Sequence, residues 1–282
     1  MNLHRRAVLT GLLAAPALIR HAHAAPQPVA AVQQPRWQRF AVPAPATNGR
    51  PAITIVVDDL GVMHPGTPRA VALPGPVTLA WFPFARNLAE QVGAATERGH
   101  ETLLHMPMQA FGNSIAWTGP DPLRIDLSAE ENLRRLVAAI DAVPDTVGLN
   151  NHMGSVATRD VALMDLVAQE VRRRDMLLLD SLTIGHSVAY RSAMQAGVPA
   201  TSRDVFIDNV ADPGAIWGQL ELTERIARQT GHVVAIGHPR PHTLDALEAW
   251  LPGLAAKGFV LWPLSATVAA RNEVVMPGVA AA

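Results

Sequence analysis

The chain has 282 residues and a formal net charge of −1, because 23 lysines and arginines nearly balance 24 aspartates and glutamates. This balance excludes the basic excess typical of proteins whose main partner is a nucleic acid. A hydrophobic fraction of 49% with 17% charged residues excludes a disordered chain, and the lack of cysteine excludes disulfides, thiolate nucleophiles and cysteine-bound metals. The length allows one or two domains, or a single α/β barrel.

The first 24 residues have the features of a signal peptide. Arg5 and Arg6 precede an apolar stretch, Ala7–Ile19, that is too short to span a bilayer, and Ala22-His23-Ala24 has the small-x-small pattern of a cleavage site. The paired arginines resemble a twin-arginine signal, and an ordinary secretory signal is the alternative. We therefore expect a periplasmic or secreted protein with no stable membrane insertion after the signal is removed.

The rest of the chain divides into three segments by composition. Residues 25–50 are rich in proline, alanine and glutamine and are predicted to form a linker or a loosely docked arm. Residues 51–266 alternate apolar runs with helical patterns and are predicted to form the folded domain. Residues 267–282 are weakly patterned and are predicted to be a tail.

Strands and helices are expected to alternate through the domain. A helix is predicted to begin at Ser128, with Glu131 three residues later as in a capping box, and to end before Pro144. Further helices are expected around Met164–Val171, Pro213–Gln229 and Thr243–Lys257. Such alternation is typical of βαβ units with a parallel sheet, so we predict a distorted β/α barrel, with an open doubly wound sheet as the alternative. The predicted strands are Ile53–Val57, Val77–Trp81, Thr102–Leu104, Thr146–Leu149, Met176–Leu179, Val205–Ile207, Val233–Ile236 and Phe259–Trp262.

Polar residues follow five of these strands directly. In a β/α barrel the reactive groups lie at the carboxyl ends of the strands, so these residues are expected to share one rim. Each residue alone has an ordinary explanation as a helix cap or a packed core histidine. Together, two histidines and one aspartate suit a zinc-type site with an open position for water. The strand-end residues are Asp58, Asp59, His105, Asn150, Asn151, His152, Asp180 and His238.

Six ordered segments together resemble the divergent polysaccharide deacetylase family, a branch of the NodB-like carbohydrate esterases. The resemblance covers about residues 50–265. It implies a NodB-like barrel and a divalent metal, often zinc, that serves the removal of N- or O-acetyl groups from polysaccharides such as peptidoglycan. The segments are VVDDLG (56–61), GHETLLHMPMQ (99–109), GLNNHMGS (148–155), LLLDS (177–181), RDVFIDN (203–209) and AIGHP (235–239).

The resemblance also implies individual roles for the strand-end residues. Asp58 corresponds to the catalytic base, and Asp59 corresponds to a metal ligand together with His105. His238 corresponds to the acid that protonates the leaving group, and Asp180 corresponds to the carboxylate that holds His238 in one tautomer. His152 is expected to be the third metal ligand.

Two positions depart from the family pattern. Gln109 stands where the family has a second histidine, and the segment that normally contains an arginine near the base has none. Gln109, Asn151 and Trp81 are further candidates for substrate contacts, and packing of the barrel rim is the alternative role for Trp81. A weakly active or inactive protein of this fold that binds cell-wall glycan or an envelope protein is the alternative function. A hydrolase that cleaves another amide or ester with the same site is a third.

Overall fold

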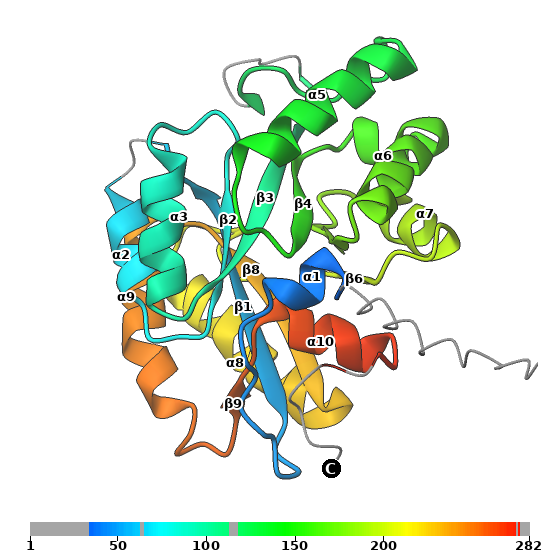
Figure 1. The fold of residues 1–282 in the computed structure, drawn as a ribbon. Coiled ribbons are helices and arrows are strands. Elements are labelled where there is room, and N and C mark those ends of the chain that lie inside the picture. The colour runs from blue at the N-terminus through cyan, green and yellow to red at the C-terminus, as the bar shows by residue number, and fades with distance from the viewer. Residues whose placement is uncertain (1–33, 63–64, 113–117, 275, 277–282) are drawn as a thin grey trace, which may run out of the picture. The chain divides into compact units, whose positions relative to one another are not determined.

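A computed structural model describes residues 34–62, 65–112, 118–274 and 276 (Figure 1). The predicted signal peptide, residues 1–24, lies outside the described residues, as does the first part of the predicted linker. None of the described helices is both long and apolar enough to cross a bilayer.

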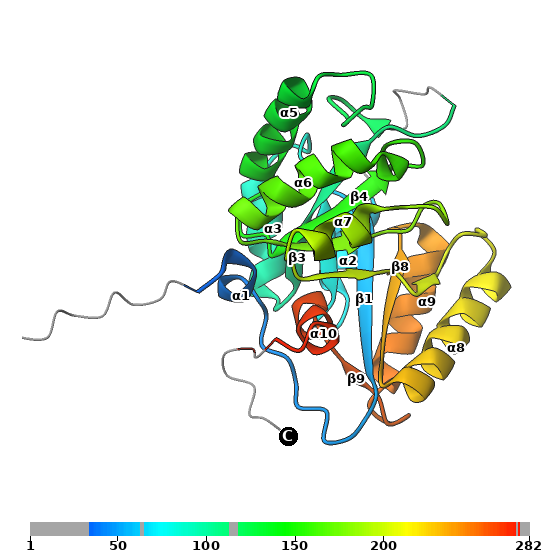
Figure 2. The same ribbon diagram turned by 90° about the vertical axis from the view of Figure 1, so that its right-hand side faces the viewer.

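A curved, wholly parallel sheet forms the centre of the molecule (Figure 2). Its strand order is β6-β5-β4-β3-β2-β1-β8-β7, and β9 pairs with β1. The predicted β/α barrel architecture, with parallel strands and outer helices, is confirmed, and every predicted strand range overlaps a strand. The short strand β6 was not predicted. The described strands are β1 (Ala52–Leu60), β2 (Thr78–Trp81), β3 (Glu101–Met108), β4 (Gly148–Met153), β5 (Leu177–Asp180), β6 (Ala200–Ser202), β7 (Val205–Phe206), β8 (His232–Gly237) and β9 (Val260–Leu261).

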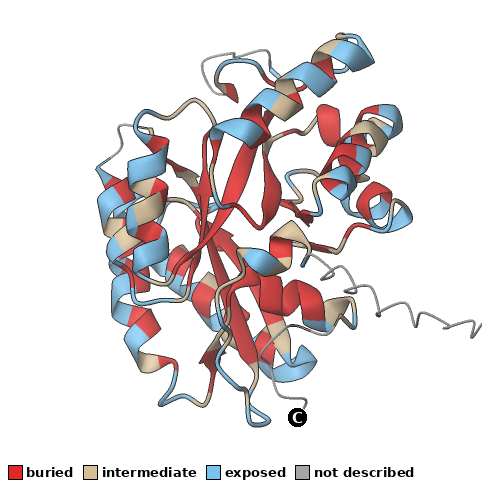
Figure 3. Ribbon diagram, viewed as in Figure 1, coloured by how far each residue is buried: buried red, intermediate tan, exposed pale blue. Residues whose placement is uncertain are grey.

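Amphipathic helices surround the sheet, with buried residues toward the strands and exposed residues outward (Figure 3). The strands are buried almost throughout, which explains their continuous apolar runs. The described helices are α1 (Arg36–Arg39), α2 (Gly66–Ala72), α3 (Leu88–Glu97), α5 (Ala129–Ala142), α6 (Val161–Arg173), α7 (Ala189–Gln195), α8 (Pro213–Thr230), α9 (Pro241–Trp250) and α10 (Leu264–Arg271), with 3-10 turns at Ala157–Arg159 and Leu251–Gly253.

The helix starts follow the capping residues in the sequence. The Ser128 hydroxyl accepts a hydrogen bond from the Glu131 backbone N–H at 3.2 Å, and Asp212 caps α8 through the Ala215 N–H at 2.9 Å. The Glu131 carboxylate binds Arg134 and Arg135, so only one half of the predicted capping box forms. These caps satisfy backbone N–H groups that have no partner inside the helix.

The segments on either side of the predicted domain belong to the same folded unit from Gln34 onward. Trp37 in α1 is buried, and its backbone N–H donates to the Asp175 carbonyl. The predicted domain end at residue 266 falls inside α10, whose residues Leu264–Ala269 are all buried. Packed residues therefore continue beyond the expected boundaries at residues 50 and 266. Small residues pack α10 against β1 and β8, and such residues show little apolar periodicity.

Glu101 caps α10 from the amino-terminal end of the sheet, opposite to the strand ends singled out above. Its carboxylate is almost fully buried and accepts hydrogen bonds from both the side-chain hydroxyl and the backbone N–H of Ser265. A negative charge at this position is favoured by the helix dipole. Burial nevertheless dominates and raises the pKa of Glu101 from its ordinary 4.5 to about 7.

We expect Glu101→Gln to change how stability depends on pH. Between about pH 4.5 and 7 the folded chain binds more protons than the unfolded chain at this residue, so stability falls as pH rises through that window. The raised pKa corresponds to about 3 kcal/mol. Urea unfolding should therefore show the variant gaining about 3 kcal/mol relative to the parent protein between pH 4.5 and 8. A Glu97→Gln control changes an exposed residue near the same end of the sheet. If the free energy of unfolding differed between Glu101→Gln and the parent protein by the same amount at pH 4.5 and at pH 8, the prediction would be wrong.

Candidate metal and catalytic site

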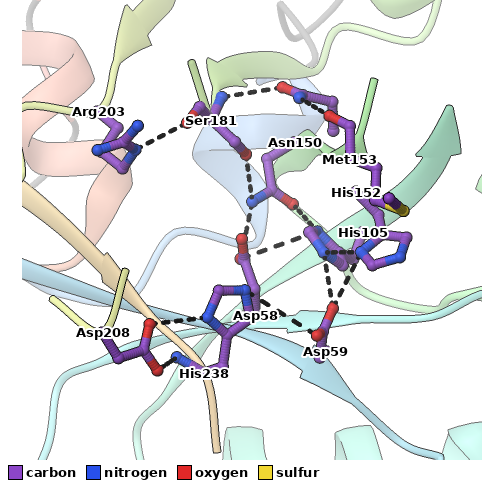
Figure 4. A network of polar contacts seen from close by, with 11 residues as sticks. Asp58, Asp59, His105, Asn150, His152, Met153, Ser181, Arg203, Asp208 and His238 are labelled. Atoms are coloured by element: carbon purple, nitrogen blue, oxygen red, sulfur yellow. Dashed lines mark hydrogen bonds and ion pairs between the residues drawn. The ribbon is translucent and has the colours of Figure 1, made fainter. Parts of the chain in front are cut away.

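The carboxyl ends of β1, β3, β4 and β8 meet at one rim of the barrel, as expected for a parallel sheet (Figure 4). Asp58 and Asp59 lie at the end of β1, and His238 directly follows β8. His105 lies within β3, which continues to Met108, and pairs with Asn150 of β4. Asp58, Asp59, His105 and His238 line a cavity of about 290 Å³.

Asp59, His105 and His152 form a compact triangle of ligand atoms. Asp59 Oδ1 lies 3.1 Å from His105 Nε2 and 3.1 Å from His152 Nδ1, and the two ring nitrogens are 3.1 Å apart. Around a tetrahedral zinc ion, bonds of about 2.0–2.1 Å place neighbouring ligands about 3.3 Å apart. The structure thus brings together the three residues predicted to be metal ligands, in a spacing that fits a divalent cation.

The backbone at Asp59 supports this geometry. Its φ angle of 62° lies in the left-handed region, which is strained for an aspartate, and the β1–β2 register shifts between Val57 and Leu60. Although both histidines approach Asp59 Oδ1, this buried oxygen has no hydrogen bond of good geometry within the described structure. A buried carboxylate oxygen in this condition has the environment of a metal ligand rather than of a hydrogen-bond acceptor.

The charges of the triangle are strongly coupled. Burial alone would raise the pKa of Asp59, but contacts with His105 and His152 outweigh it and hold this pKa well below its usual range. Burial alone would lower the pKa of His105, but Asp58 and Asp59 outweigh it and raise this pKa to about 9. The same carboxylate charges that favour a proton on His105 would also favour a divalent cation at this position.

Asn150 connects the triangle to Asp58. Its Oδ1 lies 2.8 Å from His105 Nδ1, and its Nδ2 donates to Asp58 Oδ1 at 2.8 Å. A carboxylate accepts only, so the amide nitrogen must face Asp58 and His105 must donate from Nδ1. Asn150 therefore leaves His105 Nε2 free to bind a cation. The sequence places Asn150 at a strand end, but this linking role depends on the register of β3 and β4.

Asp58 is buried, and burial raises its pKa despite the opposing influence of His105, His238 and Asn150. Its Oδ1 is occupied by Asn150, whereas its Oδ2 has no hydrogen bond among the described residues. The side chain also lines the cavity that contains the triangle. Asp58 is therefore placed to accept a proton inside the cavity through Oδ2.

The expected contact between Asp180 and His238 is wrong. His238 Nδ1 lies 2.9 Å from Asp208 Oδ1, and Asp208 is also held by the His238 backbone N–H and the Thr243 hydroxyl. Asp180 instead accepts from the Ser187 hydroxyl and from backbone N–H groups in the following turn. The reason is topological, because Asp208 follows β7, the neighbour of β8, whereas Asp180 ends β5.

Asp208 also determines the charge of His238. Burial alone would lower the pKa of His238, but the Asp208 carboxylate outweighs it and raises this pKa. With Nδ1 engaged by Asp208, Nε2 is directed toward the site, 3.9 Å from Asp59 Oδ2. Asp208 could have been predicted from the sequence, because it directly follows the predicted strand Val205–Ile207, as the other site residues follow theirs.

Of the three residues predicted to contact the substrate, Asn151 lines the cavity, whereas Gln109 and Trp81 do not. Gln109 points away from the cavity, and its Oε1 accepts from the Ile125 backbone N–H at 2.9 Å. Trp81 is fully buried and cannot present its face to a sugar. Asn151 lines the cavity, but both ends of its amide are bound to backbone atoms, at Met153 and Ser181. The aromatic ring beside the histidines belongs to Phe82, 4.7 Å from the ring of His152.

Gln109→Ala is accordingly expected to leave metal content unchanged. The substitution removes one neutral hydrogen bond, to the Ile125 N–H, and should cost about 1 kcal/mol of stability. For a domain of this size that corresponds to a fall in Tm of about 2–4 °C. Metal analysis and thermal unfolding check the two parts, and His152→Ala is the matched variant that should lose the metal. Loss of metal from Gln109→Ala would identify Gln109 as a ligand.

Comparisons with known proteins agree with the architecture. The sequence model of a family described as divergent polysaccharide deacetylase matches residues 55–268. The chain is 34% identical over 209 residues to the "uncharacterized protein YibQ" of Escherichia coli K12. The matched region covers 74% of this chain and 64% of that protein, so the chain spans less than two thirds of the length of this relative. It is also 34% identical over 202 residues to an "uncharacterized protein" of Haemophilus influenzae, covering 72% of this chain and 71% of that protein.

A solved structure shows the same fold. The "uncharacterized protein ATU2773" from Agrobacterium tumefaciens C58 matches with a TM-score of 0.79 at 25% sequence identity. The match covers 82% of this chain and 94% of that chain. The arrangement of strands and helices is therefore shared over nearly the whole of a known protein.

Proposed function

The chain belongs to the divergent polysaccharide deacetylase family, and on that premise we propose that it is a metal-dependent hydrolase that removes acetyl groups from an envelope polysaccharide. The observation that carries the proposal is the Asp59–His105–His152 triangle in one cavity with Asp58 and His238. These five residues supply a cation site, a base and an acid. Hydrolysis of an acetamide uses all three functions, because the departing amine must be protonated.

Asp59, His105 and His152 would hold the metal. Two imidazole nitrogens and one carboxylate oxygen are a donor set typical of catalytic zinc. When bound, such an ion acts as a Lewis acid toward the acyl oxygen and lowers the pKa of water. Asn150 contributes by fixing the tautomer of His105, so that the ring enters the site with Nε2 available.

Asp58 is the base of the proposed reaction. Its carboxylate is held by Asn150 through Oδ1, so Oδ2 accepts the proton of the attacking water. Burial raises the pKa of Asp58, and a higher pKa makes a carboxylate a stronger base. The same burial excludes bulk water from the carboxylate, which keeps the proton inside the site.

His238 is the acid, and Asp208 is its positioning residue. Asp208 accepts the Nδ1 hydrogen of His238, so the Nε2 proton faces the cavity and is donated to the departing nitrogen or oxygen. Phe206 packs against the His238 ring, with the ring centres 5.5 Å apart. On the other side, Phe82 packs against His105 and His152 and excludes water from the proposed metal ligands.

Acetate release and metal content test the proposal together. The purified protein should contain about one divalent metal ion per chain and release acetate from an N-acetylated glycan or from an acetyl ester of a glycan. Removal of the metal with a chelator should stop the release, and return of zinc should restore it. Unchanged release in a His105→Ala protein would refute this site. A metal-free protein that binds glycan strands without turnover would favour the alternative, a non-catalytic glycan-binding role.

We also propose that the protein acts in the periplasm or outside the cell. The support is the amino-terminal sequence, with Arg5-Arg6 and the Ala22-His23-Ala24 pattern. An Arg5→Lys, Arg6→Lys substitution should retain the precursor inside the cell if export uses the twin-arginine route. Fractionation of cells that express the two forms measures the outcome.

A further inference from the structure

The cavity that contains the proposed catalytic groups is also lined by two arginines. The formally charged side chains among its described lining residues are Asp58, Asp59, Arg203 and Arg240. The two carboxylates contact the site histidines, and a divalent ion would balance their charge. The two guanidinium charges remain, so the cavity has a positive excess that the reaction proposed above does not use.

Arg203 is held in a fixed orientation. Its Nε donates to the Ser181 carbonyl at 2.7 Å (Figure 4). Its Nη2 donates to the Leu182 carbonyl at 2.8 Å. The guanidinium lies over the Phe206 ring, 4.8 Å from its centre. A guanidinium has five N–H donors, and two of them are used in these bonds. The remaining donors belong to a planar fork that is already ordered, which lowers the entropy cost of binding a ligand.

Arg203 also lacks a direct carboxylate partner. Its hydrogen-bond acceptors among the described residues are neutral carbonyl groups, and Asp58, Asp180 and Asp204 influence it only through space. Burial lowers the pKa of Arg203, as expected for a cation that has lost part of its hydration. A partly buried cation has lost hydration free energy, and an anion that binds to its unused hydrogen-bond donors compensates for this loss.

Arg240 adds a second charge at the exposed side of the same cavity. Its Nη1 donates to the Asp208 carbonyl at 2.9 Å, and it forms no ion pair with a described carboxylate. Arg203, Phe206 and Thr183 also line an adjoining cavity of about 430 Å³ that contains Asn209 and Gln219. The Arg203–Phe206 pair therefore stands between the catalytic cavity and a neighbouring space with amide side chains suited to sugar hydroxyls.

We propose that Arg203 and Arg240 bind a carboxylate on the glycan, so that the preferred substrate is an acidic polysaccharide whose charged group lies on or beside the acetylated sugar. This inference rests on the proposed function, because it assigns the substrate of that site. The fork of Arg203 matches the two oxygens of a carboxylate. With the carboxylate bound there, the acetyl group enters the adjoining cavity of Asp58 and His238.

Binding is measured with the full chain carrying Asp58→Asn, so that turnover does not consume the ligand. The probes are an N-acetylglucosamine–N-acetylmuramic acid disaccharide, the same disaccharide with its carboxyl group amidated, and a phosphorylated N-acetylglucosamine disaccharide. Titration calorimetry should show the carboxylated form binding at least about 10-fold more tightly than the amidated form. This preference should weaken as salt is added.

Arginine variants in the same background identify the residues responsible. Arg240→Gln should lower the affinity for the carboxylated disaccharide about 10-fold and leave the amidated form unaffected. Arg203→Lys keeps the charge but removes the fork, and should give an intermediate loss. Arg98→Gln is the matched control, because it removes one exposed arginine at the end of α3, before the amino-terminal end of β3.

Equal affinity for the carboxylated and amidated forms would overturn the proposal, and so would equal losses in Arg240→Gln and Arg98→Gln. Tighter binding of the phosphorylated disaccharide would overturn the assignment of a carboxylate. Acetate release from the same disaccharides by the protein with Asp58 intact tests the hydrolase separately. A carboxylate preference that depends on the arginines, without any acetate release, would support the anion site and contradict the proposed hydrolase.

Discussion

Asp58→Asn and Asp59→Asn proteins are expected to lose acetate release for different reasons. The Asp59→Asn protein should lose its bound metal, because a neutral amide replaces the one charged ligand among Asp59, His105 and His152. The Asp58→Asn protein should keep about one metal ion per chain and release acetate about 10³-fold more slowly, since it lacks only the base. Metal analysis and initial rates on the same preparations distinguish the two.

The geometry around Asp58 allows loss of the base to be separated from loss of the metal. An asparagine at position 58 keeps an oxygen that can accept from Asn150 Nδ2, so Asn150 can still hold His105 Nδ1. The triangle of ligand atoms should therefore survive the substitution. At position 59, by contrast, the oxygen that faces both histidines loses its charge, and the two imidazoles alone bind a divalent ion more weakly.

An Asp126→Asn protein is the control for removal of one carboxylate. Asp126 is exposed and pairs with Arg124, an interaction of the kind that contributes little to stability. Its metal content and rate should equal those of the parent protein. If Asp58→Asn also lost the metal, Asp58 would be a ligand, and the separate roles assigned to the adjacent aspartates would be wrong.

The fold and much of the site could be predicted because both depend on local patterns. Buried parallel strands have continuous apolar runs, and the residue that follows such a run lies at a known rim of the barrel. Asp58, His152 and His238 were found in this way. Their convergence follows from the parallel direction of the strands and does not require the strand order to be known.

The interactions that could not be predicted depend on strand order and on side-chain direction. Asp180 and Asp208 both follow apolar strands, and only the pairing of β7 with β8 determines that Asp208 reaches His238. Gln109 occupies the position of a family histidine, but a backbone N–H at Ile125 turns its side chain away. Such choices are made by tertiary contacts between segments distant in sequence, and no local pattern encodes them.

An Asp208→Asn protein is expected to hydrolyse an N-acetyl amide about 10²-fold more slowly while its rate on 4-nitrophenyl acetate stays nearly unchanged. An amine must be protonated to leave, whereas nitrophenolate leaves without a proton. Asp208 acts through His238, whose Nδ1 it holds at 2.9 Å and whose charged form it favours. The ratio of the two rates therefore measures the acid function separately from metal binding and from overall stability.

Asp180→Asn is the matched variant, because it changes a carboxylate that is equally buried but bonded to Ser187 and the turn after β5. It should lower stability and leave the ratio of amide to ester rates as in the parent protein. If Asp180→Asn changed that ratio and Asp208→Asn did not, Asp180 would be the partner of His238 during the reaction. The two strands would then have to move relative to each other, since β1 to β4 lie between β5 and β8 along the described sheet.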